Sequence, residues 1–125
     1  MAVKSCEDLI VWQKTMDLTV EIYRLVKFLP REETYALSDQ MRRAVVSIPS
    51  NISEGYGRYS TKEFINFLFI ARGSFSELKY QLQICHRLKY FSESESEYAL
   101  NLCNEVYKIL NALISKLKQK LVARV

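Results

Sequence analysis

Apolar residues recur every three or four positions along four segments of this 125-residue chain. This spacing puts them on one face of an α-helix, whereas a half-buried β-strand needs alternation at every second position. The segments are separated by short polar links, and short links join helices that lie antiparallel. The sequence therefore predicts an all-α, antiparallel, up-down-up-down four-helix bundle forming one domain over residues 1–125, with helices over residues 6–28, 34–54, 61–90 and 95–121.

The composition agrees with a compact helical core. Hydrophobic residues make up 49% of the chain, which has only 3 glycines and 2 prolines, so few loops are expected. A single domain of this length is large enough to bury a core. We expect the core to contain Trp12, Tyr23, Met41, Ile48, Leu68, Leu78, Leu82, Leu102, Ile109 and Leu113.

The second predicted helix has a proline, Pro49, inside its apolar pattern. Proline lacks an N–H, and its ring collides with the carbonyl four residues earlier, so the helix should kink or break there at a cost of about 3 kcal/mol. We expect a kink, because the apolar pattern continues beyond the proline. Gly55 should then end the helix, since glycine adopts a left-handed conformation without steric penalty.

Serines followed by acids mark the helix starts, because a serine hydroxyl and a carboxylate can satisfy the free N–H groups of a first turn. Ser60 and Glu63 have the spacing of a capping box. Ser5 precedes an aspartate at the same spacing, and Ser92 and Ser94 are alternative caps for the last helix.

Cysteine and histidine usage gives no sign of a metal site. Cys6, Cys85 and Cys103 form no CxxC pair, and His86 is the one histidine, so no zinc-ligand spacing exists. We expect reduced thiols in a cytoplasmic protein. No apolar run approaches the roughly 18 residues that a membrane span needs, and the first residues do not have the pattern of a signal peptide. We expect no membrane association.

No set of residues predicts catalysis, which would need a nucleophile with a base, paired carboxylates or a metal cluster. His86 stands beside two cations near the end of a predicted helix, where its charge is favoured. Glu54 and Glu63 are explained as a helix-end residue and a cap. The run of residues 55–58, GYGR, follows no strand and so lacks the context of a phosphate loop. We predict a protein that is not an enzyme, with no catalytic residue, cofactor, metal or small-molecule substrate.

A group of basic residues is the candidate binding site. Arg42 and Arg43 are adjacent on the second predicted helix, and Arg58 and Lys62 follow it, with tyrosines interleaved. Arginine next to aromatic residues suits phosphates and stacked bases. We expect these four residues to form one surface that binds nucleic acid or a partner protein. The alternative is that the arginines pair with nearby acids and serve the fold or a subunit contact.

The last helix carries a second basic run, with no acid after Glu105. A solvated helix end explains it, because lysines oppose the negative end of the helix dipole. A phosphate-contacting arm is the alternative. The residues are Lys108, Lys116, Lys118, Lys120 and Arg124.

The third predicted helix indicates self-association. Residues 64–71 are apolar at every position except Asn66, and a helix that is apolar on all sides must be covered from more than one direction. A four-helix bundle of this size covers only part of it, so a second subunit is the expected cover. We assign Phe67, Phe69 and the small residue Gly73 to this interface.

Three motifs carry a resemblance to a known family: LIVWQK at residues 9–14, RRAVVSIPSNISEGYGR at 42–58 and FLFIARGSFSEL at 67–78. They resemble the small four-helix-bundle proteins encoded in intervening sequences of bacterial 23S ribosomal RNA genes. The accessory variability determinant protein of diversity-generating retroelements is similar in fold. The resemblance covers roughly residues 7–90. It implies a homopentamer and, through the retroelement protein, an accessory role beside a nucleic-acid-processing enzyme.

Two functions follow from these observations. The first is a non-enzymatic bundle that self-associates and presents a basic surface to RNA, DNA or a nucleic-acid-processing protein. The second is a scaffolding homo-oligomer whose arginines serve only its own interfaces. They differ in whether the cations face solvent on the folded protein.

Overall fold

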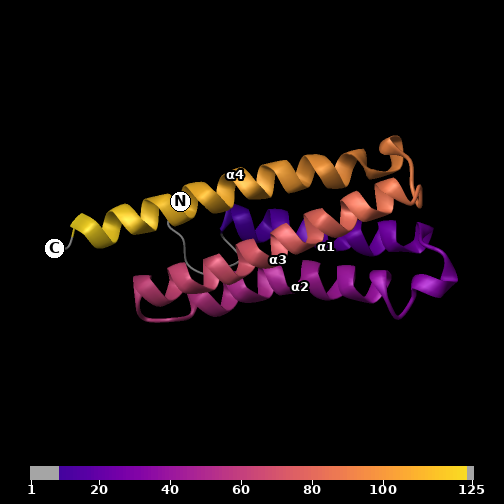
Figure 1. Ribbon diagram of the computed structural model, residues 1–125. Coiled ribbons are helices and arrows are strands. Elements are labelled where there is room, and N and C mark those ends of the chain that lie inside the picture. Colours follow the sequence, from indigo (N-terminus) through magenta and orange to yellow (C-terminus); the bar gives the residue numbers. More distant parts are fainter. Residues whose placement is uncertain (1–8, 124–125) are drawn as a thin grey trace.

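The structure is a computed structural model that describes residues 9–123. The described residues form four long helices, and each of them runs opposite to the one before it (Figure 1). No strand occurs in this part of the chain, and the predicted all-α four-helix bundle is confirmed. The elements are α1 (Ile10–Leu25), the 3₁₀ turns η2 (Val26–Phe28) and η3 (Arg31–Glu33), α2 (Leu37–Tyr56), α3 (Thr61–Arg87) and α4 (Glu93–Ala123).

Each helix packs on two neighbours, so the bundle has four sides. α1 contacts α2 and α4, and α3 contacts the same two helices from the other side. α4 has 31 residues and α1 has 16, which at 1.5 Å per residue makes them about 46 and 24 Å long. The end of α4 therefore extends past the start of α1 (Figure 1). None of the described helices combines the length and the apolar character needed to cross a membrane.

The helix boundaries differ from the predicted ones by a few residues. The first helix gives way to a 3₁₀ turn after Leu25, and its predicted start at residue 6 lies outside the described residues. The second helix begins at Leu37 instead of residue 34, because η3 and a turn occupy the preceding positions. Helix α3 ends at Arg87, before the predicted residue 90.

A left-handed residue explains the end of α3. Lys89 has φ 60°, and its N–H donates to the His86 carbonyl at 3.1 Å. The N–H of Tyr90 donates to the Cys85 carbonyl at 3.0 Å. These two bonds form a Schellman motif, which satisfies the last carbonyls of a helix. A lysine does here what glycine commonly does, so composition gave no signal for this stop.

Two predicted caps are present. The Ser60 hydroxyl accepts from the Glu63 N–H at 3.0 Å at the start of α3. At the start of α4, Ser92 is the cap: its hydroxyl accepts from the Glu95 N–H at 3.1 Å, and its own N–H donates to the Glu95 carboxylate at 2.7 Å. This reciprocal pair is a capping box. The cap predicted at Ser5 lies outside the described residues.

Helix α2 continues through Pro49, which is buried. The helix does not break there, and the kink stays a prediction. Gly55 does not end the helix, because α2 runs on to Tyr56 and its final cap is Gly57 with φ −76°. Gly55 has a different role: a Cβ on it would stand 2.6 Å from the Cβ of Phe67. The absence of a side chain at this position lets α2 and α3 approach closely.

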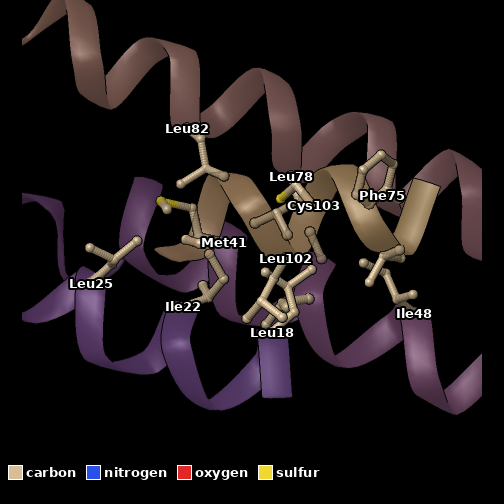
Figure 2. Close-up of a cluster of buried hydrophobic side chains, with 14 of the residues drawn as sticks. Leu18, Ile22, Leu25, Met41, Ile48, Phe75, Leu78, Leu82, Leu102 and Cys103 are labelled. Atoms are coloured by element: carbon tan, nitrogen blue, oxygen red, sulfur yellow. The ribbon is translucent and has the colours of Figure 1, made fainter. Parts of the chain in front are cut away.

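The core lies between all four helices (Figure 2). Trp12, Ile109 and Leu113, which we expected in it, are only partly buried against it. The assignment of Tyr23 to the core is wrong, because this side chain is 43% exposed. The buried stripe of α1 instead passes one position away, through Leu18 and its neighbours. The predicted core residues that are buried are Met41, Ile48, Leu68, Leu78, Leu82 and Leu102.

Candidate nucleic-acid interface

The structure does not bring the four predicted basic residues together. Arg42 and Arg43 lie in the second turn of α2, whereas Arg58 follows the end of this helix and Lys62 lies in the first turn of α3. At 1.5 Å per residue, the two arginines on α2 are about 24 Å from Arg58 along the helix. The predicted site is therefore two separate pairs at opposite ends of α2.

Three of these four cations have partners within the chain. Arg43 and Arg58 each pair with the acid four residues earlier, at N–O distances of 3.1 and 2.5 Å. Arg42 donates to the backbone carbonyl of Thr34 at 3.3 Å, which ties the start of α2 to the turn before it. Lys62 is exposed. Two of the four positive charges of this group are thus balanced by acids, and a third cation is held by a backbone carbonyl.

A different group of cations lies where α3 and α4 pack side by side. It combines cations, aromatic rings and an amide from the two helices, linked by contacts at the surface. We call this surface the basic face, and its residues are Phe69, Arg72, Lys79, Tyr107, Asn111 and Lys118.

One end of the basic face is built around Phe69. The Arg72 guanidinium lies 4.9 Å from the centroid of this ring, and the Lys118 Nζ from α4 lies at the same distance. The Arg72 Nη1 also donates to the Asn111 Oδ1 at 3.0 Å. A cation over an aromatic ring is attracted by the electron density of the ring face. Phe69 and Asn111 therefore hold two cations in place at the surface.

The other end of the basic face is built around Tyr107. Its ring stacks on Phe75 with a centroid distance of 5.7 Å and an interplanar angle of 24°. The Lys79 Nζ lies 5.8 Å from the Tyr107 centroid. Phe75 is 1% exposed and Tyr107 is 47% exposed. The tyrosine ring is thus packed on a core residue on its inner side, and its outer side faces the solvent.

Among the described residues, the cations of the basic face have no acidic partners. The ion pairs among residues 9–123 do not include Arg72, Lys79 or Lys118. The carboxylate of Glu105 on α4 is directed to α1, where it pairs with Lys14 at 2.8 Å. This hydrogen bond raises the pKa of Lys14. The acid nearest in sequence to these cations on α4 is therefore occupied on another side of the bundle.

The seven-residue spacing of polar residues in the last two helices is a sequence signal for the basic face, and our prediction did not include it. Arg72 and Lys79 are seven residues apart, as are Asn111 and Lys118, and seven residues are about two turns of helix, so each pair shares one face. The predicted basic run on the last helix included Lys118 alone among them. We predicted a site at Arg42 and Arg43 because they are adjacent in sequence, but adjacent residues point in different directions on a helix.

Of the three residues predicted for self-association, the two phenylalanines are only partly exposed. Phe67 and Phe69 are both half-buried. The Arg58 guanidinium lies 5.0 Å from the Phe67 centroid, and two cations flank Phe69. The chain thus covers much of the apolar start of α3 with its own side chains. Gly73 is exposed, with open space where a Cβ would stand.

Exposed apolar residues lie on both sides of Gly73 along α3 and at its C-cap. Ile70, Tyr80, Ile84 and Leu88 are 52%, 70%, 39% and 51% exposed. Together with Gly73 they are separated by three, seven, four and four residues. These intervals place them on one side of the helix. We call these residues the α3 ridge: Ile70, Gly73, Tyr80, Ile84 and Leu88.

His86 and Ser96 form a pair of the kind found in catalytic sites, but its geometry favours a structural role. The His86 Nε2 and the Ser96 Oγ are 3.0 Å apart. Ser96 is 0% exposed, and its hydroxyl lies 3.2 Å from the carbonyl oxygens of Ser92 and Glu93. The serine hydroxyl is thus enclosed by two backbone carbonyls of its own helix as well as by the imidazole, and which atom donates in the His86–Ser96 bond depends on the histidine tautomer. The histidine thereby links the end of α3 to the start of α4.

The two cysteines of the described chain are buried thiols. Burial raises the pKa of Cys85 and that of Cys103 to about 11, so both thiols are protonated at neutral pH. Within residues 9–123, no three histidine, cysteine, aspartate or glutamate side chains gather in a way that could hold a metal ion.

Comparison with known proteins identifies the family of this chain. A family model described as 23S rRNA-intervening sequence protein matches residues 7–112, whereas no curated protein matches. The fold is similar to a crystal structure from Bacteroides thetaiotaomicron VPI-5482, of a protein with unknown function from the S23 ribosomal protein family. That protein is 33% identical, with a TM-score of 0.77, and the match covers 85% of this chain and 96% of the other. The chain belongs to the 23S rRNA-intervening sequence protein family.

Proposed function

We propose that this protein is a non-enzymatic helical bundle that self-associates and binds the phosphate backbone of nucleic acid through the basic face. The observation that carries the proposal is a row of three cations, Arg72, Lys79 and Lys118, on the outer side of α3 and α4. None of them pairs with a carboxylate of the described chain. A cytoplasmic location belongs to the same proposal.

The arrangement of these cations suits phosphates. Phe69 to Lys79 is ten residues of one helix, so the row extends about 15 Å along the bundle. Contacts to phosphates are independent of base sequence, and they release condensed counterions, which makes the affinity fall steeply with salt. Several subunits in one assembly would present several such rows, and linked weak contacts sum to a higher avidity.

Neutralising the row tests the proposal. We expect the triple variant R72Q/K79Q/K118Q to bind a fluorescent oligonucleotide at least about tenfold more weakly at low salt. The slope of log affinity against log salt should become shallower by about 2, because each lost phosphate contact removes roughly 0.7 to 0.9 from it. Fluorescence anisotropy at a series of salt concentrations measures both quantities.

The control is a second triple variant, K27Q/R31Q/K89Q, which removes three exposed cations at the turn that follows α1 and the turn that follows α3. It lowers the formal net charge of +4 by the same amount. We expect it to retain most of the affinity and of the salt slope. Equal losses in the two variants would mean that net charge alone attracts the nucleic acid, and the basic face would then have no special role.

The α3 ridge is the surface that we propose for self-association. Replacing Ile84 by aspartate should dissociate the assembly, because a charge buried between subunits lacks a partner. The matched control is Val20→Asp on α1, which is 70% exposed and outside the ridge. Sedimentation velocity at micromolar concentration reports the mass of each variant. A wild-type chain that sediments as a monomer would refute the proposal, and the number of five subunits rests on resemblance alone.

A scaffolding homo-oligomer is the second candidate, and the arginines of α2 favour it. Arg43 and Arg58 are balanced by acids of α2, and Arg42 donates to the turn before this helix, so these residues contribute to the fold without any ligand. An assembled wild-type protein that binds oligonucleotides no more tightly than R72Q/K79Q/K118Q would support this candidate.

A further inference from the structure

We infer that Tyr107 is a stacking platform for a nucleobase and that the basic face therefore takes single-stranded nucleic acid. This inference rests on the proposed function, because it names the class of ligand for the same surface. It starts from the Tyr107 ring, which is the exposed upper member of a stacked pair with Phe75.

The packing below Tyr107 fixes the orientation of its ring. Phe75 is 1% exposed and belongs to the buried cluster in Figure 2, so it is held by the core. The ring of Tyr107 lies over it at 5.7 Å and 24°, an offset stack of the favourable kind. One face of Tyr107 is thus occupied by the protein. The Lys79 Nζ lies over the ring at 5.8 Å from its centroid. Because the residue is 47% exposed, solvent still reaches it beside this cation, and another planar group can contact the ring there.

The cations near Tyr107 would hold the phosphate backbone of a nucleic-acid strand next to the ring. The Lys79 Nζ lies 5.8 Å from the Tyr107 centroid, and Arg72 precedes it by two turns of α3. A strand whose phosphates follow these two cations passes along the edge of the tyrosine. Its sugar and base then lie within reach of the ring. Basic grooves that carry such aromatic side chains hold single strands in this way.

A duplex does not suit this arrangement. Its bases are paired and stacked on one another, so their faces are not available to a protein ring. A duplex could contact only the cations. A single strand can use both the cations and the ring, since an unstacked base has a free π-face whatever its identity. The platform therefore favours single strands without selecting a sequence.

Phe69 shows that not every ring of the basic face can act in this way. It is half-buried, with Arg72 and Lys118 each 4.9 Å from its centroid. These cations occupy the positions that a base would need. Tyr107 has a single such cation among the described residues, the Lys79 Nζ over its ring at the longer distance of 5.8 Å, and so is less covered than Phe69. The structure thus assigns one stacking position to each subunit.

Two substitutions at one position test the inference. Tyr107→Leu keeps an apolar cover over Phe75 but removes the π-face, whereas Tyr107→Phe keeps both. The probes are a mixed-sequence RNA of about 12 nucleotides, within the range of single-strand site sizes, and the duplex of the same sequence. Tyr107→Leu should weaken single-strand binding by about fivefold or more, as expected for the loss of one stacked base. Tyr107→Phe should bind like the wild type.

Duplex affinity should be the same in all three proteins, because the cations are unchanged. Circular dichroism checks that both variants keep the helical fold. The inference is overturned if Tyr107→Leu binds the single strand as tightly as Tyr107→Phe, or if it weakens the duplex equally. If R72Q/K79Q/K118Q also leaves single-strand affinity intact, the proposed function fails with it. If that triple variant loses affinity and Tyr107→Leu does not, only the stacking platform is wrong.

Discussion

Replacing Ile22 by alanine should lower the free energy of unfolding by about 2–5 kcal/mol. Ile22 is 0% exposed on α1 and belongs to the cluster in Figure 2. The substitution removes apolar atoms from contact with the other core side chains and leaves a cavity that the helices fill only partly. A domain of this size has a total stability of about 5–15 kcal/mol, so the loss is a large fraction of it.

Ile10→Ala is the control for this substitution. It deletes the same atoms from the same helix, but Ile10 is 62% exposed. We expect a change within about 0.5 kcal/mol, as for other surface substitutions. Urea denaturation at one protein concentration measures both variants, and an unchanged m-value shows that the comparison is valid. Similar losses at the two positions would show that the core is not where the structure places it.

Two glycine-to-alanine substitutions should change the free energy of unfolding in opposite directions. Alanine is favoured over glycine inside a helix by about 1 kcal/mol, and both Gly55 and Gly73 lie within helices. A Cβ at Gly55 would stand 2.6 Å from the Phe67 Cβ and 3.0 Å from the Phe64 Cδ1. Relieving these contacts requires α2 and α3 to move apart, and such overpacking costs typically 1–3 kcal/mol.

Gly55→Ala should therefore destabilise the bundle by up to about 2 kcal/mol after the helix preference is subtracted. Gly73→Ala meets no atom within 4 Å and should stabilise the chain by roughly 0.5–1 kcal/mol. Thermal and urea denaturation of both variants at the same concentration give the two signs. Stabilisation by Gly55→Ala would contradict the close approach of α2 and α3.

The sequence determined the fold class, because helix formation depends on short-range spacing. The interval of three or four residues between apolar side chains predicted four helices, and the cap at Ser60 is visible as a serine three residues before a glutamate. Ser92 and Ser94 both have this spacing, so the sequence left them as alternatives. These signals depend on neighbours within one turn. Gly55 shows the limit of the same reasoning. A glycine near the end of a helix usually serves the local turn, but here it serves a contact with α3, which is distant in sequence.

The first helix shows why the core was only partly predictable. Its apolar residues cover more than one side, and the stripe through Trp12 and Tyr23 fits a helical period as well as the stripe through Leu18 and Ile22. Period alone cannot choose between them. The positions of α2 and α4 decide, since they cover the second stripe and leave Tyr23 at the surface.

Only the tertiary structure decided the candidate site. We expected a kink at Pro49 and a turn at Gly55 to bring Arg58 back beside Arg42. Helix α2 instead continues to Tyr56, and its rise separates the two arginines by about 24 Å. The basic face joins Arg72 to Asn111 and Lys79 to Tyr107, residues whose proximity exists only because α3 and α4 pack side by side. A sequence gives spacing along each helix directly. It does not give the rotation and pairing of helices, which follow from the burial of side chains from all four helices at once.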